Sequence, residues 1–203
     1  GLNHPWFSTH GNHDALLQGT VLADETLREF AIGNRRVSAL PPDLDLMKTM
    51  QEYSPVGPAR YPSFEGAGFT PITPDSRRTI VEPDDWAELH LRCGHDHGLT
   101  ETNKVAKTKY WARDFDQVRL ISLDTVNANG GWQGSLDRAQ FEWLKLELSN
   151  PVPKYFVLTS HHPLENLFNL YAGHGEAPRV GTEELKTLLL ANPRVLLWLA
   201  GHN

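Results

Sequence analysis

The sequence contains a single cysteine, Cys93, in 203 residues. One cysteine excludes an internal disulfide framework and any zinc finger built from several cysteines. Basic residues are also in the minority, with 19 Lys and Arg against 25 Asp and Glu, and the formal net charge is −6. An acidic balance argues against a broad basic face, so we expect no strong nucleic-acid surface.

Long hydrophobic runs are absent as well. The longest apolar stretch near the C-terminus, 195–200, is far too short to cross a bilayer, so we expect no membrane span. The content of 39% hydrophobic and 22% charged residues is typical of a globular fold rather than a disordered chain. The length fits one domain with a sizeable core.

The second half of the chain alternates between two kinds of pattern. Apolar runs predict strands and amphipathic runs predict helices, with strands at 118–123, 155–159 and 195–199 and helices at about 135–148 and 182–190. Ser135 and Thr182 are the expected N-caps of the two helices. This alternation predicts an α/β layered fold, in which ligands gather beyond the carboxyl ends of the strands.

The first half is less regular. We predict a short strand at 6–9 and helices at 24–32 and 44–53. Between 55 and 83 lie six of the 14 prolines, and no hydrophobic period survives there. We therefore predict one domain over 1–203 with a Pro/Gly-rich insertion at about 34–115. A linker between two domains is the competing interpretation.

Several of the ten histidines stand in short loops that follow apolar runs. Asn12 and His13 follow the first such run, His161 and His162 follow the second predicted strand of the regular half, and His202 follows the third. Imidazoles combined with an amide or carboxylate oxygen suit divalent ions such as Mn, Fe, Zn or Ni. Three ligands on separate strands can hold a metal that is open on one side, as catalysis requires.

Three motifs occur in an order that resembles the later motifs of the calcineurin-like metallophosphoesterases. They are Gly11-Asn12-His13-Asp14, Ser160-His161-His162-Pro163 and Gly201-His202-Asn203. In that family an Asp-x-His and a Gly-Asp segment come first, followed by Gly-Asn-His-Asp/Glu, a His ahead of a Pro, and Gly-His-x-His. The resemblance implies a layered α/β/β/α sandwich, incomplete at its N-terminus, and metal-dependent hydrolysis of a phosphate mono- or diester.

The resemblance also implies a role for each matching residue. Asn12, His161 and His202 would be ligands of one metal ion in a pair of Mn, Fe or Zn type. His13 would face the phosphate of a small substrate, where it would stabilise the transition state or protonate the leaving oxygen. Asp14 would hydrogen-bond to His13 and favour its charged form.

Two parts of the family's pattern are missing from this sequence. Nothing before Gly11 supplies the Asp-x-His and Gly-Asp segments, and the sequence stops at Asn203, the x position of Gly-His-x-His. We therefore expect a chain truncated at both ends that carries the second half of a bimetallic site. It should bind one metal ion or none and be inactive in isolation. A catalytically silent fragment or binding module that retains the fold is the alternative.

Three further histidines are weaker candidates for substrate binding: His162, His174 and His97. The segment 94–98, Gly-His-Asp-His-Gly, resembles a Gly-His-x-His motif when taken alone, but it comes too early in the order of motifs. We interpret it as a loop at the rim of the site. A single-metal hydrolase that uses His95 and His97 is the other interpretation.

Overall fold

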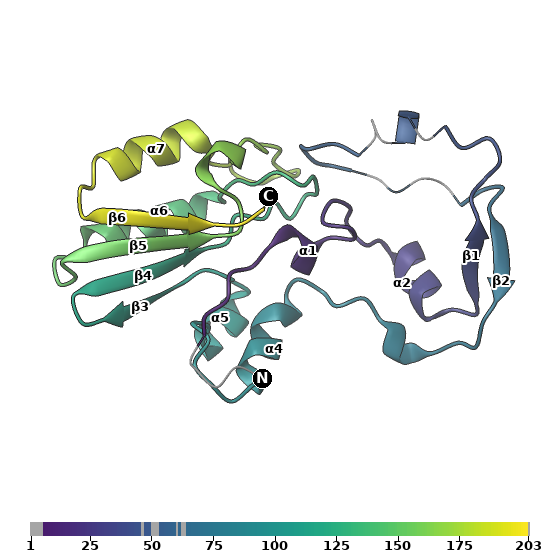
Figure 1. The fold of residues 1–203 in the computed structure, drawn as a ribbon, viewed down its shortest axis with the longest axis horizontal. Coiled ribbons are helices and arrows are strands. Elements are labelled where there is room, and N and C mark those ends of the chain that lie inside the picture. Colours follow the sequence, from purple (N-terminus) through teal and green to yellow (C-terminus); the bar gives the residue numbers. More distant parts are fainter. Residues whose placement is uncertain (1–5, 46, 50–52, 60, 62–63, 203) are drawn as a thin grey trace.

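The main sheet has four strands, in the order β3 (Trp111–Phe115), β4 (Val118–Leu123), β5 (Tyr155–Ser160) and β6 (Val195–Ala200) (Figure 1). The computed structural model describes residues 6–45, 47–49, 53–59, 61 and 64–202. β3 pairs antiparallel with β4, whereas β4, β5 and β6 run parallel. The α/β class and the three strands predicted in the second half are confirmed.

Two helices cover one face of this sheet, α6 (Arg138–Ser149) and α7 (Thr182–Leu190) (Figure 1). The main core lies between them and the strands. Phe156 and Leu158 of β5 pack in one buried cluster with Leu144 of α6 and Leu185 of α7, and none of the four has measurable exposure. Burial of each such side chain stabilises the fold by about 1.5–3 kcal/mol, so this layer fixes where the strands end.

The N-caps of these helices differ from those predicted. Asp137 caps α6, where its side chain accepts from the Gln140 N–H at 2.7 Å. Ser135 instead donates its hydroxyl to the Asn169 carbonyl at 2.6 Å. Gly181 is the N-cap of α7, and the Thr182 hydroxyl donates to a carbonyl outside the helix. The hydroxyls of Ser135 and Thr182 thus donate to backbone carbonyls that are distant in the sequence. The local residue pattern does not reveal such long-range partners.

The N-terminal segment crosses the other face of the sheet. Trp111 donates its indole N–H to the Ser8 carbonyl at 3.3 Å, and the hydroxyls of Thr9 and Thr159 lie 3.3 Å apart. The strand predicted at 6–9 is wrong, because this segment is held by side-chain contacts and joins no strand ladder. It nevertheless leads straight into α1 (Asn12–Ala15), beside the carboxyl edge of the sheet (Figure 1).

The expected sandwich requires a second large sheet on this face. The second sheet among the described residues is a two-stranded antiparallel ribbon of β1 (Arg35–Ala39) and β2 (Gly68–Pro71), which lies apart from the main sheet (Figure 1). Leu197 and Leu199 of β6 are 50% and 52% exposed. The structure thus has one helix layer on one main sheet, and the full sandwich stays a prediction.

The predicted insertion contains regular elements rather than one long loop. Besides β1 and β2 these are η1 (Ser76–Arg78), α4 (Asp85–Arg92) and α5 (Glu101–Ala106). Its predicted end near residue 115 overlaps β3, a strand of the main sheet. The Gly57 N–H donates to Oδ1 of Asn169 at 3.2 Å, and the Gln133 N–H donates to the Pro55 carbonyl at 3.0 Å. These bonds attach the middle of the insertion to the main body.

The helix predicted at 24–32 is confirmed as α2 (Glu25–Ile32). Asp24 is its N-cap and accepts from the Leu27 N–H at 2.9 Å. The helix predicted at 44–53 includes residues 46 and 50–52, which lie outside the described residues. Within the described part of the chain, every helix is too short or too polar to traverse a bilayer, in agreement with the sequence.

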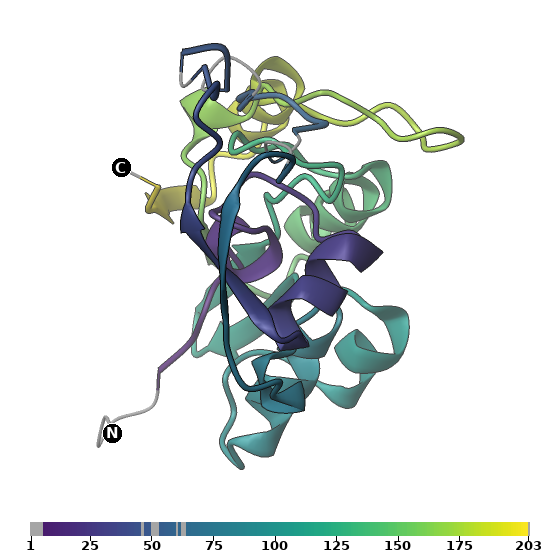
Figure 2. The ribbon, with the colours of Figure 1, turned by 90° about the vertical axis from the view of Figure 1, so that its right-hand side faces the viewer.

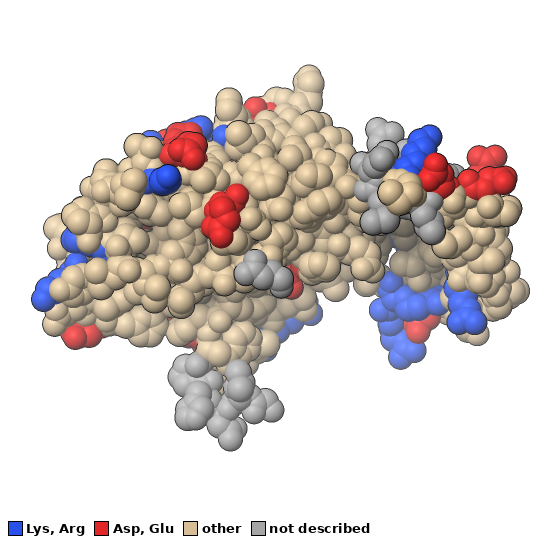
Figure 3. All heavy atoms as spheres, turned by 45° about the horizontal axis from the view of Figure 1, so that its top comes forward, with Lys and Arg blue, Asp and Glu red and all other residues tan. Residues whose placement is uncertain are grey.

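Positive side chains gather at the end of the molecule that carries β1 and β2, on the face shown in Figure 3. Some of them are engaged within the fold. The Arg35 guanidinium lies 4.5 Å from the centre of the Phe69 ring, and Arg77 forms an ion pair with Asp75 at 2.9 Å. These contacts account for part of the local positive charge. The absence of a nucleic-acid surface stays a prediction.

Candidate metal centre

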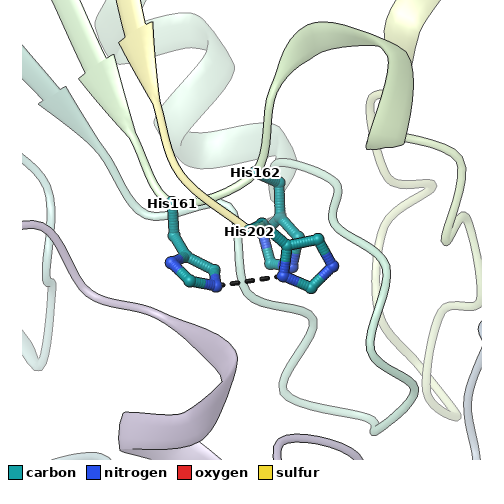
Figure 4. A group of neighbouring side chains, drawn as sticks. All are labelled: His161, His162 and His202. Atoms are coloured by element: carbon teal, nitrogen blue, oxygen red, sulfur yellow. Dashed lines mark hydrogen bonds between the residues drawn. The ribbon is translucent and has the colours of Figure 1, made fainter.

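The carboxyl ends of three parallel strands meet at one edge of the main sheet. There His161 directly follows β5, Asp124 directly follows β4, and His202 lies two residues after the end of β6. Figure 4 shows a nitrogen of the His161 ring directed at the His202 ring, whose plane is inclined at 76° to it, with α1 nearby. The predicted convergence of these loops is therefore present in the structure.

His161 and His202 form the closest pair. Nε2 of His161 lies 3.0 Å from Nδ1 of His202, and one of these nitrogens donates a hydrogen bond to the other (Figure 4). Two nitrogen ligands of one metal, each bound at 2.0–2.1 Å, are separated by about 2.9 Å in octahedral and about 3.4 Å in tetrahedral geometry. The two rings thus already have the separation of ligands that share an ion.

The electrostatics favour the neutral, metal-binding form of both rings. Burial, and then the neighbouring His202, lowers the pKa of His161 below its usual range. Burial, and then His13, lowers the pKa of His202. A metal ligand must be the unprotonated imidazole, so a lower pKa reduces competition from protons.

Asn12, the third proposed ligand, carries an amide oxygen that is free of protein donors among the described residues. Its side chain is 2% exposed, and its Nδ2 donates to the Gly19 carbonyl at 2.8 Å. Its Oδ1 is buried and has no hydrogen-bond partner. Leaving such an acceptor unpaired costs about 1–3 kcal/mol, so a partner at this oxygen would stabilise the site.

Gly11, the residue before Asn12, packs closely against the ring of His161. A Cβ at Gly11 would stand 2.9 Å from Nδ1 of His161, which is closer than real Cβ contacts allow. Only glycine therefore permits the backbone before Asn12 to lie on the His161 ring. This contact explains why glycine precedes the amide in the first motif.

His162 does not fit the substrate-binding role predicted for it. Its ring is fully buried, and its Nε2–H donates to the Trp132 carbonyl at 3.0 Å. Its Nδ1 accepts from the Thr125 hydroxyl at 2.8 Å. Although its nitrogens lie within 4.8 Å of those of His161 and His202, both are engaged and no lone pair is free for an ion. His162 instead positions the loop that carries His161.

The buried His162 predicts a stability that falls in acid. Burial, with a further contribution from His202, lowers its pKa from 6.5 to about 3. The imidazole binds a proton near pH 6.5 in the unfolded chain but only near pH 3 in the folded chain. The free energy of unfolding therefore keeps its full value above pH 6.5 and falls as the pH is lowered toward 3. We expect the free energy of unfolding to decrease by up to about 1.4 kcal/mol per pH unit in this window.

Urea denaturation of the metal-free chain at several pH values measures this slope. In His162→Gln, which retains an N–H donor for Trp132 but has no titrating ring, the extra slope should disappear. An equal slope in the variant would assign the acid sensitivity to other groups.

His13 and Asp14 are both exposed on α1. Asp14 accepts from the Gly11 N–H through Oδ2 at 2.8 Å, and within the described structure no hydrogen bond joins it to His13. The predicted Asp14–His13 bond is therefore wrong, because successive side chains on a helix point in different directions. His13 lies close enough to the histidine pair to contribute to the lowered pKa of both rings.

The remaining two candidates lie away from the histidine pair. His97 is 3% exposed, stacks on Trp6 with ring centres 3.8 Å apart, and contacts the Trp6 carbonyl through Nδ1 at 3.0 Å. It packs within a small core rather than at a rim, so the predicted substrate role does not fit. His95 is exposed beside it. The exposed His174 lies on the loop before α7 that extends from the main body in Figure 2.

Sequence reasoning missed the pair formed by His10 and Asp124. The Nδ1–H of His10, which is 2% exposed, donates to Oδ1 of Asp124 at 3.0 Å. Burial alone would raise the pKa of Asp124, but His10, together with Lys109 and the Val126 N–H, outweighs it, and the pKa is lowered. The pair fastens the residue before the Gly11 motif to the end of β4. Its sequence signal was the position of Asp124 directly after a strand.

The chain matches no family model, and comparison with curated proteins and with solved structures returns no significant match. The case for a function therefore rests on the motifs and on the geometry of their residues.

Proposed function

We propose that this chain is the metal-binding half of a phosphoesterase that hydrolyses a phosphate mono- or diester with divalent metal ions. Asn12, His161 and His202 would hold one ion. The observation that carries the proposal is the pair of imidazole nitrogens of His161 and His202, 3.0 Å apart, with the Gly11 backbone that precedes Asn12 packed on the His161 ring. Nitrogen and amide-oxygen donors together suit Mn, Fe or Zn.

The proposed chemistry assigns separate tasks to the residues around the ion. A bound metal pair would neutralise phosphate charge and supply a nucleophile near neutral pH. Asn12 at the start of α1, with His161 and His202 just beyond two strands, would hold the ion. His13, which is exposed on α1, would stabilise the transition state or protonate the leaving oxygen. His162 and the His10–Asp124 pair hold the loops in place through hydrogen bonds.

Metal titration and a hydrolysis assay test the proposal. We expect the 203-residue chain to bind one Mn²⁺ and the full gene product to bind two. The full gene product should hydrolyse p-nitrophenyl phosphate, lose this activity with chelator and regain it with Mn²⁺. Calorimetry and metal analysis give the stoichiometry.

The alternative is a catalytically silent module that keeps the fold. Zero or one ion per full gene product, together with no hydrolysis in Mn²⁺, would support the module and reject the enzyme. Two ions with chelator-sensitive hydrolysis would reject the module.

A further inference from the structure

A pocket of about 230 Å³ opens beside His13 and Asp14, on the side of α1 that faces α2. Its other walls come from the loop before α2 and from residues 80–83, which follow η1. Apolar side chains make up much of the lining: Leu17, Leu22, Ile80, Val81 and Pro83. The pocket is thus mostly apolar, with an imidazole and a carboxylate at one side.

The charged residues of the pocket leave no free positive charge. Arg28 lies in the lining, but its Nε and Nη2 donate to the two carboxylate oxygens of Glu82 at 2.7 and 3.0 Å. Asp14 adds a negative charge. A phosphate placed in the pocket would meet a neutralised arginine and an acidic group, so the pocket disfavours the anionic part of a substrate.

The same features favour an uncharged organic group. A cavity of about 150 Å³ lined by Leu, Ile and Phe accommodates benzene, so 230 Å³ holds an aromatic ring or a short alkyl chain. Leu22 and Val81 are 42% and 52% exposed in the structure and would be covered by such a group. Burial of apolar surface contributes about 25 cal/mol per Å².

From these observations we infer that the pocket binds the organic group of the ester, an apolar group about the size of one aromatic ring, while the phosphate stays on the metal side of His13. This inference rests on the proposed function. His13 lines the pocket, and its Nε2 lies beside Gly19 together with Nδ2 of the proposed ligand Asn12: a Cβ at Gly19 would stand 2.6 and 2.5 Å from these two nitrogens. A substrate that spans the two sites therefore places its bridging oxygen next to His13.

Two non-hydrolysable phosphonates with equal charge test the inference. On the Mn²⁺-loaded chain, calorimetry should give phenylphosphonate an affinity about tenfold higher than methylphosphonate, which is about 1.4 kcal/mol. Leu22→Asn, which keeps similar volume but adds a polar amide, should bring the two affinities together. Leu190→Asn, at an exposed position on α7, is the matched control and should keep the tenfold ratio.

A metal-free titration separates this inference from the proposed function. Benzyl alcohol should shift the backbone amide resonances of Leu22 and Val81 in the metal-free chain, and less so in Leu22→Asn. Failure of Mn²⁺ to bind would overturn the proposed function. Equal affinities for the two phosphonates on a chain that binds Mn²⁺, or no shifts with benzyl alcohol, would overturn the pocket inference alone.

Discussion

His161→Ala is expected to weaken Mn²⁺ binding by more than about 100-fold. Changes in residues that merely orient metal ligands cost 10–100-fold, and loss of a ligand should cost more. His161 also contacts His202 through its Nε2 and packs against Gly11, the residue before Asn12. Calorimetric titration of the 203-residue chain measures the change.

The control is the same substitution at an exposed histidine. His174→Ala removes an imidazole from the loop before α7 and should leave Mn²⁺ affinity unchanged. If His161→Ala binds Mn²⁺ as tightly as the parent chain, the proposed metal centre is wrong. Equal losses in both variants would indicate scattered surface binding instead of one site.

His13→Ala is expected to reduce kcat of the full gene product by about 10²–10⁴-fold, the usual contribution of a positioned acid or base. Metal content should stay nearly unchanged, because the three proposed ligands do not include His13. KM should change less than kcat, since the imidazole acts on the charge that develops at the leaving oxygen. Steady-state kinetics with metal analysis of the same samples measure both effects.

His95→Ala is the matched control for this experiment. His95 is exposed on the segment between α4 and α5 and should be dispensable. Full rate in His13→Ala would refute the role assigned to His13. Loss of activity in His95→Ala would instead support a single-metal hydrolase that uses His95 and His97, although the burial of His97 against Trp6 opposes it.

The sheet edge could be predicted because it depends on short-range patterns. Strands β4, β5 and β6 are apolar runs that stop at polar loops, and parallel pairing brings such ends together. Which of His161 and His162 is buried could also have been predicted, from the alternation of side chains along β5. Burial alternates along β5 from Phe156, and continuing that period of two places His162 toward the core.

Other parts of the structure depend on contacts between distant residues. Ser135 and Asp137 are both good capping residues, and only the position of Asn169 decides that Ser135 bonds elsewhere. The bond between His10 and Asp124 joins residues far apart in the sequence, and no local pattern specifies it. Propensity and periodicity describe neighbours along a chain and therefore cannot give such pairs.

Asn12 and His202 lie near opposite ends of the sequence, yet both segments meet at His161, on whose ring Gly11 packs and whose Nε2 lies 3.0 Å from His202. Bringing such distant segments together costs loop-closure entropy, which grows slowly with length. An ion held by both ends would repay that cost by mass action, adding about 2.7 kcal/mol to stability when its concentration is 100 times its Kd. At low metal concentration the N-terminal segment would then detach more often from the main body. The chain would consequently be cleaved more readily by proteases.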